Sequence, residues 1–408
     1  MVVMRIVHAA DVHLDSPLRG LSRFADDETA HGLRRASRRA LENLVHLAVS
    51  EGAQALVLAG DVYDGDWPDY ATGRFFAQQM DVLHQNRVKV YVVAGNHDAQ
   101  SVVTKAVRLP DNVTVMATDK AQTSIDDDLG LAVHGQGFAQ RAVTENLVLA
   151  YPERVRGLVN VGLLHTAVDG AEGHATYAPC TPRDLAQCDY DYFALGHVHQ
   201  RRVVNDGQRV AAFPGNLQGR HAGETGAKGA LVVDVEHDER ARTRFVPLDV
   251  ARWEHLSVDA SGLRTFDEVL DAVDSALDDA RASADGRRLV ARVTVTGSTR
   301  AAGALGRREH FHEQVLALAQ RKHITLEKAR SRALAPQEVN PADRELLEAI
   351  LGNRADFAEL AEVVRPLQRD FGRHLRGTEL DLDDDAVLER VVGAAVDGLV
   401  ARLSAEEG

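Results

Sequence analysis

The stretch Ala94-Gly95-Asn96-His97-Asp98 follows a largely apolar run, residues 88–93, that is typical of a buried strand. It places an amide, an imidazole and a carboxylate on the loop directly after that strand. A neutral amide is a weak metal ligand on its own, so Asn96 becomes useful where carboxylates and imidazoles already hold cations. The stretch therefore directs attention to the residues that end the other strands.

Four other apolar runs end in polar residues of the same kinds. Residues 4–10 lead to Asp11-Val12-His13, and residues 55–59 lead to Gly60-Asp61-Val62-Tyr63-Asp64. Residues 161–164 lead to His165, and residues 192–195 lead to Gly196-His197-Val198-His199. Helical patterns separate the first three strands, which predicts α/β layering with parallel strands. Ligands of such sheets bind at the carboxyl ends of the strands, where all of these motifs fall.

Composition limits the class of protein. The 408 residues suffice for two or three domains, and 45% hydrophobic with 26% charged residues is ordinary for a globular chain. No apolar run approaches the roughly 20 residues that span a bilayer, and we see no secretion signal at the N-terminus. Cys180 and Cys188 could form one bridge but give no disulfide framework. We therefore expect a cytoplasmic protein with no membrane partner.

The net charge of −14 argues against a generic polyanion-binding protein, because Lys and Arg drive such binding. Aromatic residues make up only 5%, which argues against an extended platform for base stacking. If the substrate is a nucleic acid, metal ions, a local basic patch or a partner must attract it.

We expect three domains: residues 1–250, a smaller α+β unit at 251–335, and a helical segment at 336–408. Residues 210–213 and 229–235 look like paired strands joined by a Gly-rich polar loop. In the middle unit, Thr265 and Glu268 form a capping-box signature for a helix. A half-exposed strand at 289–295 and a helix at 309–320 follow.

The residues at the strand ends form a mixed oxygen and nitrogen ligand set. Such a set suits Mn²⁺, Fe²⁺, Zn²⁺ or Co²⁺ better than Ca²⁺ or Mg²⁺. Seven ligands suit two ions if one carboxylate bridges them, and a pair of ions is the arrangement that clamps a phosphoryl group. Each residue alone could be an ordinary loop residue, but burying the whole set without cations would be costly. The predicted metal ligands are Asp11, His13, Asp61, Asn96, His165, His197 and His199.

The five motifs resemble those of the calcineurin-like metallophosphoesterases, which implies a β-sandwich flanked by helices, with a small α+β capping domain and C-terminal helices. Two further stretches, HAADVHLDSP at 8–17 and PGNLQGRH at 214–221, are similar to SbcD-type DNA repair nucleases, especially the bacterial YhaO-like branch. The specific resemblance covers about residues 1–250. It extends to the remainder only through the order of domains.

The resemblance also implies roles for single residues. One ion would be held by Asp11, His13, Asp61 and His199, and the other by Asp61, Asn96, His165 and His197. His97 would stabilise charge on the phosphate and protonate the leaving oxygen, with Asp64 orienting it. A capping role for Asp64 stays open. Asp98 is either a hydrogen-bond acceptor behind the ligands or a loop cap.

The function implied is that of a two-metal DNA nuclease, a 3′→5′ exonuclease with single-strand endonuclease activity in double-strand-break repair. Mn²⁺ is the expected ion. The C-terminal helices would dock an SMC-like coiled-coil ATPase of the SbcC/YhaN type, or else pack on their own domain, and a homodimer is compatible with the resemblance. One alternative is a phosphatase or small-molecule phosphodiesterase, and another is a non-catalytic scaffold of the ATPase.

Several weaker signals have two readings. Arg220, His221 and Lys228 could contact DNA phosphates or form a solvated hairpin tip. His310 and His312 point apart on a helix, which favours surface positions over a metal site. His134 ends a strand without a motif partner, so we expect it to be a packing residue.

Overall fold

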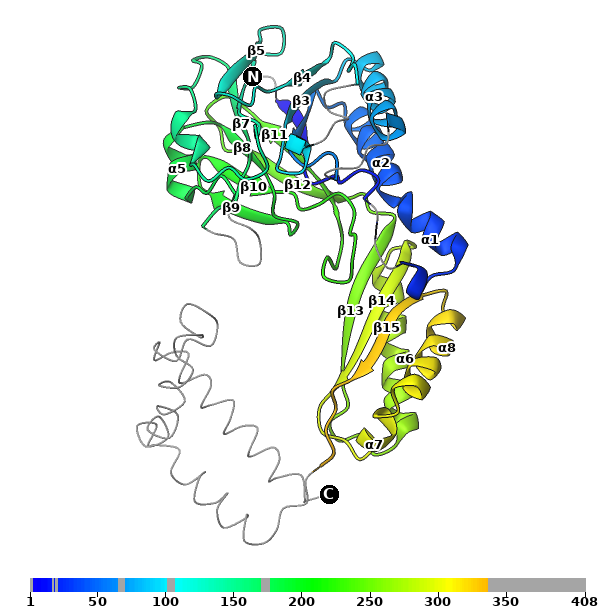
Figure 1. The fold of residues 1–408 in the computed structure, drawn as a ribbon. Coiled ribbons are helices and arrows are strands. Elements are labelled where there is room, and N and C mark those ends of the chain that lie inside the picture. The colour runs from blue at the N-terminus through cyan, green and yellow to red at the C-terminus, as the bar shows by residue number, and fades with distance from the viewer. Residues whose placement is uncertain are drawn as a thin grey trace, which may run out of the picture. The chain divides into compact units, whose positions relative to one another are not determined.

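A computed structural model of the chain describes residues 3–16, 18, 21–64, 70–100, 107–169 and 177–336. Two six-stranded mixed sheets and one three-stranded sheet make up its β-structure (Figure 1). The predicted helical segment at 336–408 lies outside the described residues except for residue 336.

The first sheet has the order β12-β11-β1-β2-β3-β4. β1 to β4 are mutually parallel, whereas β11 is antiparallel to both β1 and β12. Helices α2 and α3 connect the parallel strands, as the alternation of patterns predicted. The bounds are β1 Met4–Ala9, α1 Asp27–Arg34, α2 Ala36–Ser50, β2 Ala55–Ala59, α3 Tyr70–Gln85, β3 Lys89–Val93, β4 Val113–Val115, β11 Gly229–Val235 and β12 Arg242–Pro247.

The second sheet has the order β5-β6-β7-β8-β10-β9, with β6, β7, β8 and β10 parallel and the two edge strands antiparallel. The strands β6, β7 and β8 are buried along their whole length and rich in apolar residues, as expected where both faces of a sheet are covered. The bounds are β5 Gln122–Asp126, β6 Leu131–Gly135, β7 Val159–His165, α5 Pro182–Gln187, β8 Tyr192–Gly196, β9 Arg202–Asp206 and β10 Val210–Phe213.

The two six-stranded sheets pack face to face. Alternate residues of the first sheet, such as Ile6 and Val57, meet Val161 and Tyr192 of the second in one buried cluster. The other face of the first sheet is covered by α2 and α3, so the predicted sandwich flanked by helices is confirmed (Figure 1). Because the side chains of a strand alternate between faces, β1 and β2 contribute to both cores.

The third sheet has the order β13-β14-β15. The expected capping box opens α6, because the Glu268 N–H donates to Thr265 Oγ1 and the Thr265 N–H donates to Glu268 Oε2. The strand expected to be half exposed, β14, is mostly buried. The bounds are β13 Ala251–Asp259, α6 Phe266–Ser283, β14 Arg288–Thr296, α7 Ala302–Leu305, α8 Arg308–Arg321 and β15 Thr325–Ser331.

The chain forms two compact units. One contains Met1–Leu256, Ala276–Val293 and Leu316–Ala329, and the other contains Ser257–Ser275, Thr294–Val315 and the chain from Arg330 onward. The borders expected at 250 and 335 stay predictions. Within the described residues, no helix combines the length and apolarity needed to cross a bilayer.

One pairing prediction is wrong. β10 pairs with β8 and β9 in the second sheet, whereas β11 pairs with β1 and β12 in the first. Two neighbouring apolar runs indicate strands but not their partners. The polar stretch between them, residues 214–228, is therefore a crossover between sheets instead of a hairpin tip.

Candidate metal centre

Strands from both sheets bring the predicted ligands together. β1, β2 and β3 are parallel neighbours, and β7 and β8 are parallel neighbours in the other sheet. The Asp11 and His13 N–H groups donate to the carbonyls of Gly60 and Asp61 at 3.0 Å, which joins the loops after β1 and β2. The carboxyl ends of five strands therefore surround one small volume.

The backbone at these positions adopts an uncommon conformation. Asp11, His13 and Asp61 have φ of 51°, 44° and 51°, and His197 has φ of 101°. Non-glycine residues rarely adopt positive φ, and each such residue costs on the order of 1–3 kcal/mol. Positive φ also occurs elsewhere in the described chain, but here it falls on four of the predicted ligands, whose conformations the surrounding contacts must hold.

Glycine at position 95 lets the third strand end approach the second. A Cβ added to Gly95 would lie 2.2 Å from Asp61 Oδ1 and 2.7 Å from the Asp61 nitrogen. In its absence, the following loop reaches Asp61, whose Oδ1 accepts the His97 N–H at 2.9 Å. Position 95 therefore requires glycine, because any side chain there would overlap the Asp61 carboxylate.

The first part of the cluster joins Asp11, His13 and His199, whose potential ligand atoms lie within 4.8 Å of one another. His199 Nε2 lies 3.6 Å from Asp11 Oδ1, and His13 Nε2 lies 3.9 Å from Asp61 Oδ2. Asp11 and His13 are buried, and the His199 side chain is 17% exposed.

The second part joins Asp11, Asp61 and His165 within the same limit. His165 Nε2 lies 3.5 Å from Asp61 Oδ2 and 3.0 Å from Asn96 Oδ1. The outer ring nitrogen of His165 bonds the Ala59 carbonyl at 2.9 Å, which places a proton on Nδ1, so Nε2 is the atom that the neutral ring would offer to a cation. Asp11 belongs to both parts, and Asp61 Oδ2 lies within 4 Å of an imidazole of each, His13 and His165.

His197 is placed at the same centre by its backbone and its ring. Its N–H donates to both oxygens of Asp11, at 3.2 and 3.0 Å. The centroid of its ring lies 5.2 Å from that of His165. All seven predicted ligands thus lie close together at the carboxyl ends of these strands.

The charges in this cluster stabilise one another. Burial alone would raise the pKa of Asp61 and of Asp11, but the adjacent imidazoles hold both below their usual range. Burial would conversely lower the pKa of His165, but Asp61 raises it to about 9. The pKa of His199 is likewise raised to about 9 by Asp11 and Glu224 against the effect of burial.

The donor set fits divalent cations. The Nε2 atoms of His13 and His199 face one another at 3.3 Å beside two buried carboxylates. Two neutral imidazoles and two carboxylates can all direct lone pairs at the same point, and a divalent cation there would bind all of them as ligands.

Comparison with known proteins agrees with this geometry. The model of the calcineurin-like phosphoesterase family matches residues 4–201, and that of the middle domain of metallophosphoesterase YhaO matches residues 253–333. The uncharacterized metallophosphoesterase YhaO of Bacillus subtilis is 30% identical over 66% of this chain and 67% of its own. The chain belongs to the calcineurin-like phosphoesterase family.

More distant relatives extend this set. The SbcD component of the nuclease SbcCD from Staphylococcus saprophyticus is 23% identical over 61% of this phosphoesterase and 70% of its own chain. The DNA double-strand break repair protein Mre11 of Methanocaldococcus jannaschii is 20% identical over 66% of this phosphoesterase and 73% of its own chain.

His97 lies at the margin of the centre and is paired with Asp64. Its Nδ1 lies 3.1 Å from Asp64 Oδ1, and its side chain is 29% exposed. The hydrogen bond with Asp64 raises the pKa of His97 despite partial burial. Asp64 also lies 3.5 Å from His13 Nδ1 and accepts the Ser16 hydroxyl at 2.6 Å. The carboxylate expected to orient His97 therefore contacts it.

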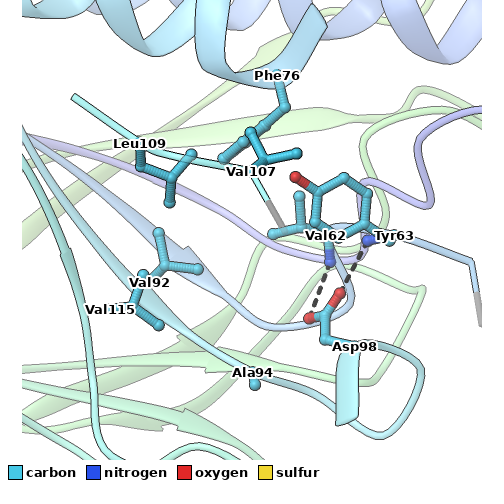
Figure 2. A pocket seen from close by; sticks show the side chains of 9 residues that line it. All are labelled: Val62, Tyr63, Phe76, Val92, Ala94, Asp98, Val107, Leu109 and Val115. Atoms are coloured by element: carbon cyan, nitrogen blue, oxygen red, sulfur yellow. Dashed lines mark hydrogen bonds between the residues drawn. The ribbon is translucent and has the colours of Figure 1, made fainter. Parts of the chain in front are cut away.

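Asp98 joins two of the phosphoesterase's ligand loops. Its carboxylate accepts the N–H groups of Val62 and Tyr63 at 3.2 and 2.9 Å (Figure 2). It also accepts the Gly95 N–H at 3.0 Å. It thereby ties the loop after β2 to the loop after β3. These contacts, all with backbone N–H groups, fit a loop cap as well as an acceptor behind the ligands, so both roles proposed for Asp98 stay open.

An apolar cavity of about 300 Å³ lies behind these loops and is separate from the metal centre. Figure 2 shows Asp98 at its margin, with the remaining lining apart from Tyr63 made of aliphatic and phenyl side chains such as Phe76 and Leu109. Such a lining offers no ligand set for a cation.

The three residues predicted to contact DNA occupy different environments. The Arg220 side chain is 19% exposed and pairs with Glu224, whereas the His221 side chain is 65% exposed. Lys228 is buried, and its Nζ donates to the His199 carbonyl at 2.9 Å. His221 is therefore the most exposed of the three, Arg220 is partly exposed, and Lys228 is buried.

His134, His310, His312 and the two cysteines belong to no group with metal-ligand spacing among the described residues. His134 is buried between Thr123 and Asn160, to which its ring nitrogens bond, so the packing prediction is confirmed. Cys180 and Cys188 are both free thiols.

Sequence reasoning missed Glu224. Its carboxylate is buried and lies 2.7 Å from His199 Nδ1. It sits in the unremarkable stretch Gly223-Glu224-Thr225-Gly226, which follows no apolar run, so no strand-end pattern could have drawn attention to it.

Proposed function

We propose that this phosphoesterase is a two-metal DNA nuclease, a 3′→5′ exonuclease with endonuclease activity on single strands, acting in double-strand-break repair. The observation that carries the proposal is the buried cluster of two aspartates and converging imidazoles around Asp61. The choice of DNA is supported by the names of the relatives, a component of a nuclease and a double-strand break repair protein.

We propose Mn²⁺ as the resident ion, with Fe²⁺, Co²⁺ and Zn²⁺ as alternatives. Asp11, His13 and His199 would hold one ion and Asn96, His165 and His197 the other, with Asp61 shared. When bound, such a pair lowers the pKa of a water and offsets charge on the phosphate. This also explains how a chain with a net charge of −14 could attract a polyanion locally.

His97 is the proposed general acid. Asp64 fixes its Nδ1 and raises its pKa, which favours the protonated ring at neutral pH. The Nε2–H is then the group that would donate a proton to the leaving sugar oxygen. His97 also belongs to a potential ligand group with His13 and Asp61, so metal binding by a His97 variant separates the two roles.

Substrate contact would involve the crossover and the middle domain. Arg220 and His221 would contact backbone phosphates, and the domain from about 251 to 335 would cap the cleft and guide the duplex by backbone contact. We leave Lys228 out of this set because its ammonium group already donates to the His199 carbonyl. We further propose a cytoplasmic location and docking of an SMC-like ATPase through the C-terminal helices.

Digestion of end-labelled DNA tests the proposal. The purified protein would be incubated with labelled duplex, a phosphomonoester and a cyclic nucleotide, each with and without Mn²⁺, beside an Asp61→Asn control. We expect Mn²⁺-dependent shortening of the duplex from its 3′ ends and no cleavage by the control. Preferential hydrolysis of either small substrate would instead identify a phosphatase or small-molecule phosphodiesterase.

A further inference from the structure

The crossover between β10 and β11, residues 214–228, holds the backbone of His199 from outside the metal centre. The His199 carbonyl accepts Lys228 Nζ at 2.9 Å and the Asn216 N–H at 3.3 Å. Burial of Lys228 lowers the pKa of its ammonium group, yet the hydrogen bond to the carbonyl satisfies one of its donors. The ligand loop after β8 is therefore fixed by a segment that supplies no ligand itself.

Glu224 holds the ring of the same histidine. Its Oε1 lies 2.7 Å from His199 Nδ1 and 3.0 Å from Arg220 Nη2. Its Oε2 accepts Asn216 Nδ2 at 2.9 Å and the Arg220 N–H at 2.7 Å. Both oxygens of this buried carboxylate are thus fixed by neighbours within the crossover, which leaves the group little freedom to turn away from the imidazole.

The contact assigns the tautomer of His199. A carboxylate only accepts, so the proton between the two groups lies on Nδ1, and the neutral, metal-binding form of the ring has its Nε2 lone pair on the side of Asp11 and His13. Arg220 Nη2 also lies 3.3 Å from Nδ1 and would require the opposite assignment if it donated there. The shorter, charge-assisted contact with Glu224 prevails, because Arg220 has the same carboxylate as its own acceptor.

We propose that Glu224 is a positioning residue of the metal centre, which holds His199 in the orientation and tautomer that present Nε2 to one of the two cations. The inference rests on the proposed two-metal centre. It adds a carboxylate that orients a metal-ligating histidine, and this carboxylate lies in none of the strand-end motifs. Groups behind a ligating histidine fix its ring and raise its basicity, and their loss typically costs about 10–100-fold in metal affinity.

Arg220 extends this arrangement toward the general acid. Its Nη1 lies 3.9 Å from Asp64 Oδ2, while its Nη2 pairs with Glu224. One guanidinium therefore lies between the carboxylate behind His199 and the carboxylate beside His97. This charge also balances Glu224, so the carboxylate stays ionised behind the ligand.

Mn²⁺ titration of the full chain tests the role of Glu224. Glu224→Gln keeps the shape but removes the charge, and it turns an amide N–H₂ toward groups that themselves donate. We expect it to weaken one of two Mn²⁺ sites by at least about 10-fold in calorimetry and to leave the other within about twofold. The electron paramagnetic resonance signal of the exchange-coupled Mn²⁺ pair would be lost at the Mn²⁺ concentration that saturates the wild type.

Glu51→Gln is the matched control, because Glu51 is a partly buried glutamate that is likewise paired with arginines, Arg5 and Arg244, but it lies directly after the C-terminal residue of α2. It should leave both Mn²⁺ affinities unchanged. Glu224→Gln with wild-type affinities at both sites would overturn the inference. A wild-type chain that binds no Mn²⁺ would instead refute the proposed centre, so the two failures are distinguishable.

A second measurement needs no variant. In long-range proton–nitrogen spectra of the Zn²⁺-loaded wild-type protein, His199 should carry its proton on Nδ1 and bind the ion through Nε2. A spectrum with the proton on Nε2 would contradict the role of Glu224 even if Glu224→Gln failed to fold.

Discussion

At the scale of single residues, the ligand cluster combines backbone strain with mutual electrostatic support. Asp11, His13 and Asp61 hold positive φ, and the cluster's carboxylates and imidazoles shift one another's pKa. Short motifs after apolar runs were enough to predict all seven converging residues, because the end of a strand fixes where the next side chains lie. Glu224 could not be predicted in this way, since it reaches His199 only through the crossover.

Replacing His97 by alanine separates proton transfer from metal binding. Because Asp64 holds the His97 ring beside the ligands, His97→Ala should lower turnover on DNA by about 10²–10⁴-fold. Both Mn²⁺ ions should stay bound, as measured by calorimetry. His46→Ala, which removes an exposed imidazole from α2, serves as the control. Loss of an Mn²⁺ ion from His97→Ala would show that this ring is a ligand.

Metal uptake should release protons. Without metal, the pKa values of His165 and His199 are raised to about 9, so both rings are protonated at pH 7. Ligation requires the neutral rings, and binding should therefore release about two protons and strengthen as pH rises toward 9. Calorimetry in buffers of different ionisation enthalpy measures this release. A binding enthalpy that is the same in every buffer would refute it.

At the scale of elements, loops that cross between strands decide the site as much as the strands themselves. The apolar runs predicted β2, β10 and β11 to the residue, because buried strands read as continuous apolar segments. The same pattern could not give the partners of β10 and β11, since register and pairing depend on contacts distant in sequence. Because β10 and β11 were expected to pair with each other, the sequence did not predict that residues 214–228 cross between the sheets and contact His199.

Asp98 offers a test of how the ligand loops are joined. Asp98→Ala leaves three buried N–H groups, those of Val62, Tyr63 and Gly95, without their acceptor. We expect the free energy of unfolding in urea to fall by about 2–4 kcal/mol. Asp111→Ala, an exposed aspartate before β4, should change it by less than about 0.5 kcal/mol. Equal free energies of unfolding for the two variants would argue against a role of Asp98 in joining the two loops.

At the scale of the whole molecule, the proposed docking of an ATPase depends on residues 336–408, most of which lie outside the described part of the chain. The sequence supplies an apolar helical stripe there, with Leu388, Val392 and Leu399 among its members. If the stripe binds a coiled coil, deleting the residues after 340 should abolish co-purification with the ATPase and leave cleavage of DNA by the free protein intact. Undiminished co-purification would exclude this segment as the docking surface.

Counting Mn²⁺ ions bound to the intact chain is the most direct test of the central claim that Asp61 is shared by two cations. We predict two ions per chain with an exchange-coupled paramagnetic resonance spectrum, and loss of that coupling in Asp61→Asn. A single ion per chain, or two ions with no coupling between them, would contradict the claim.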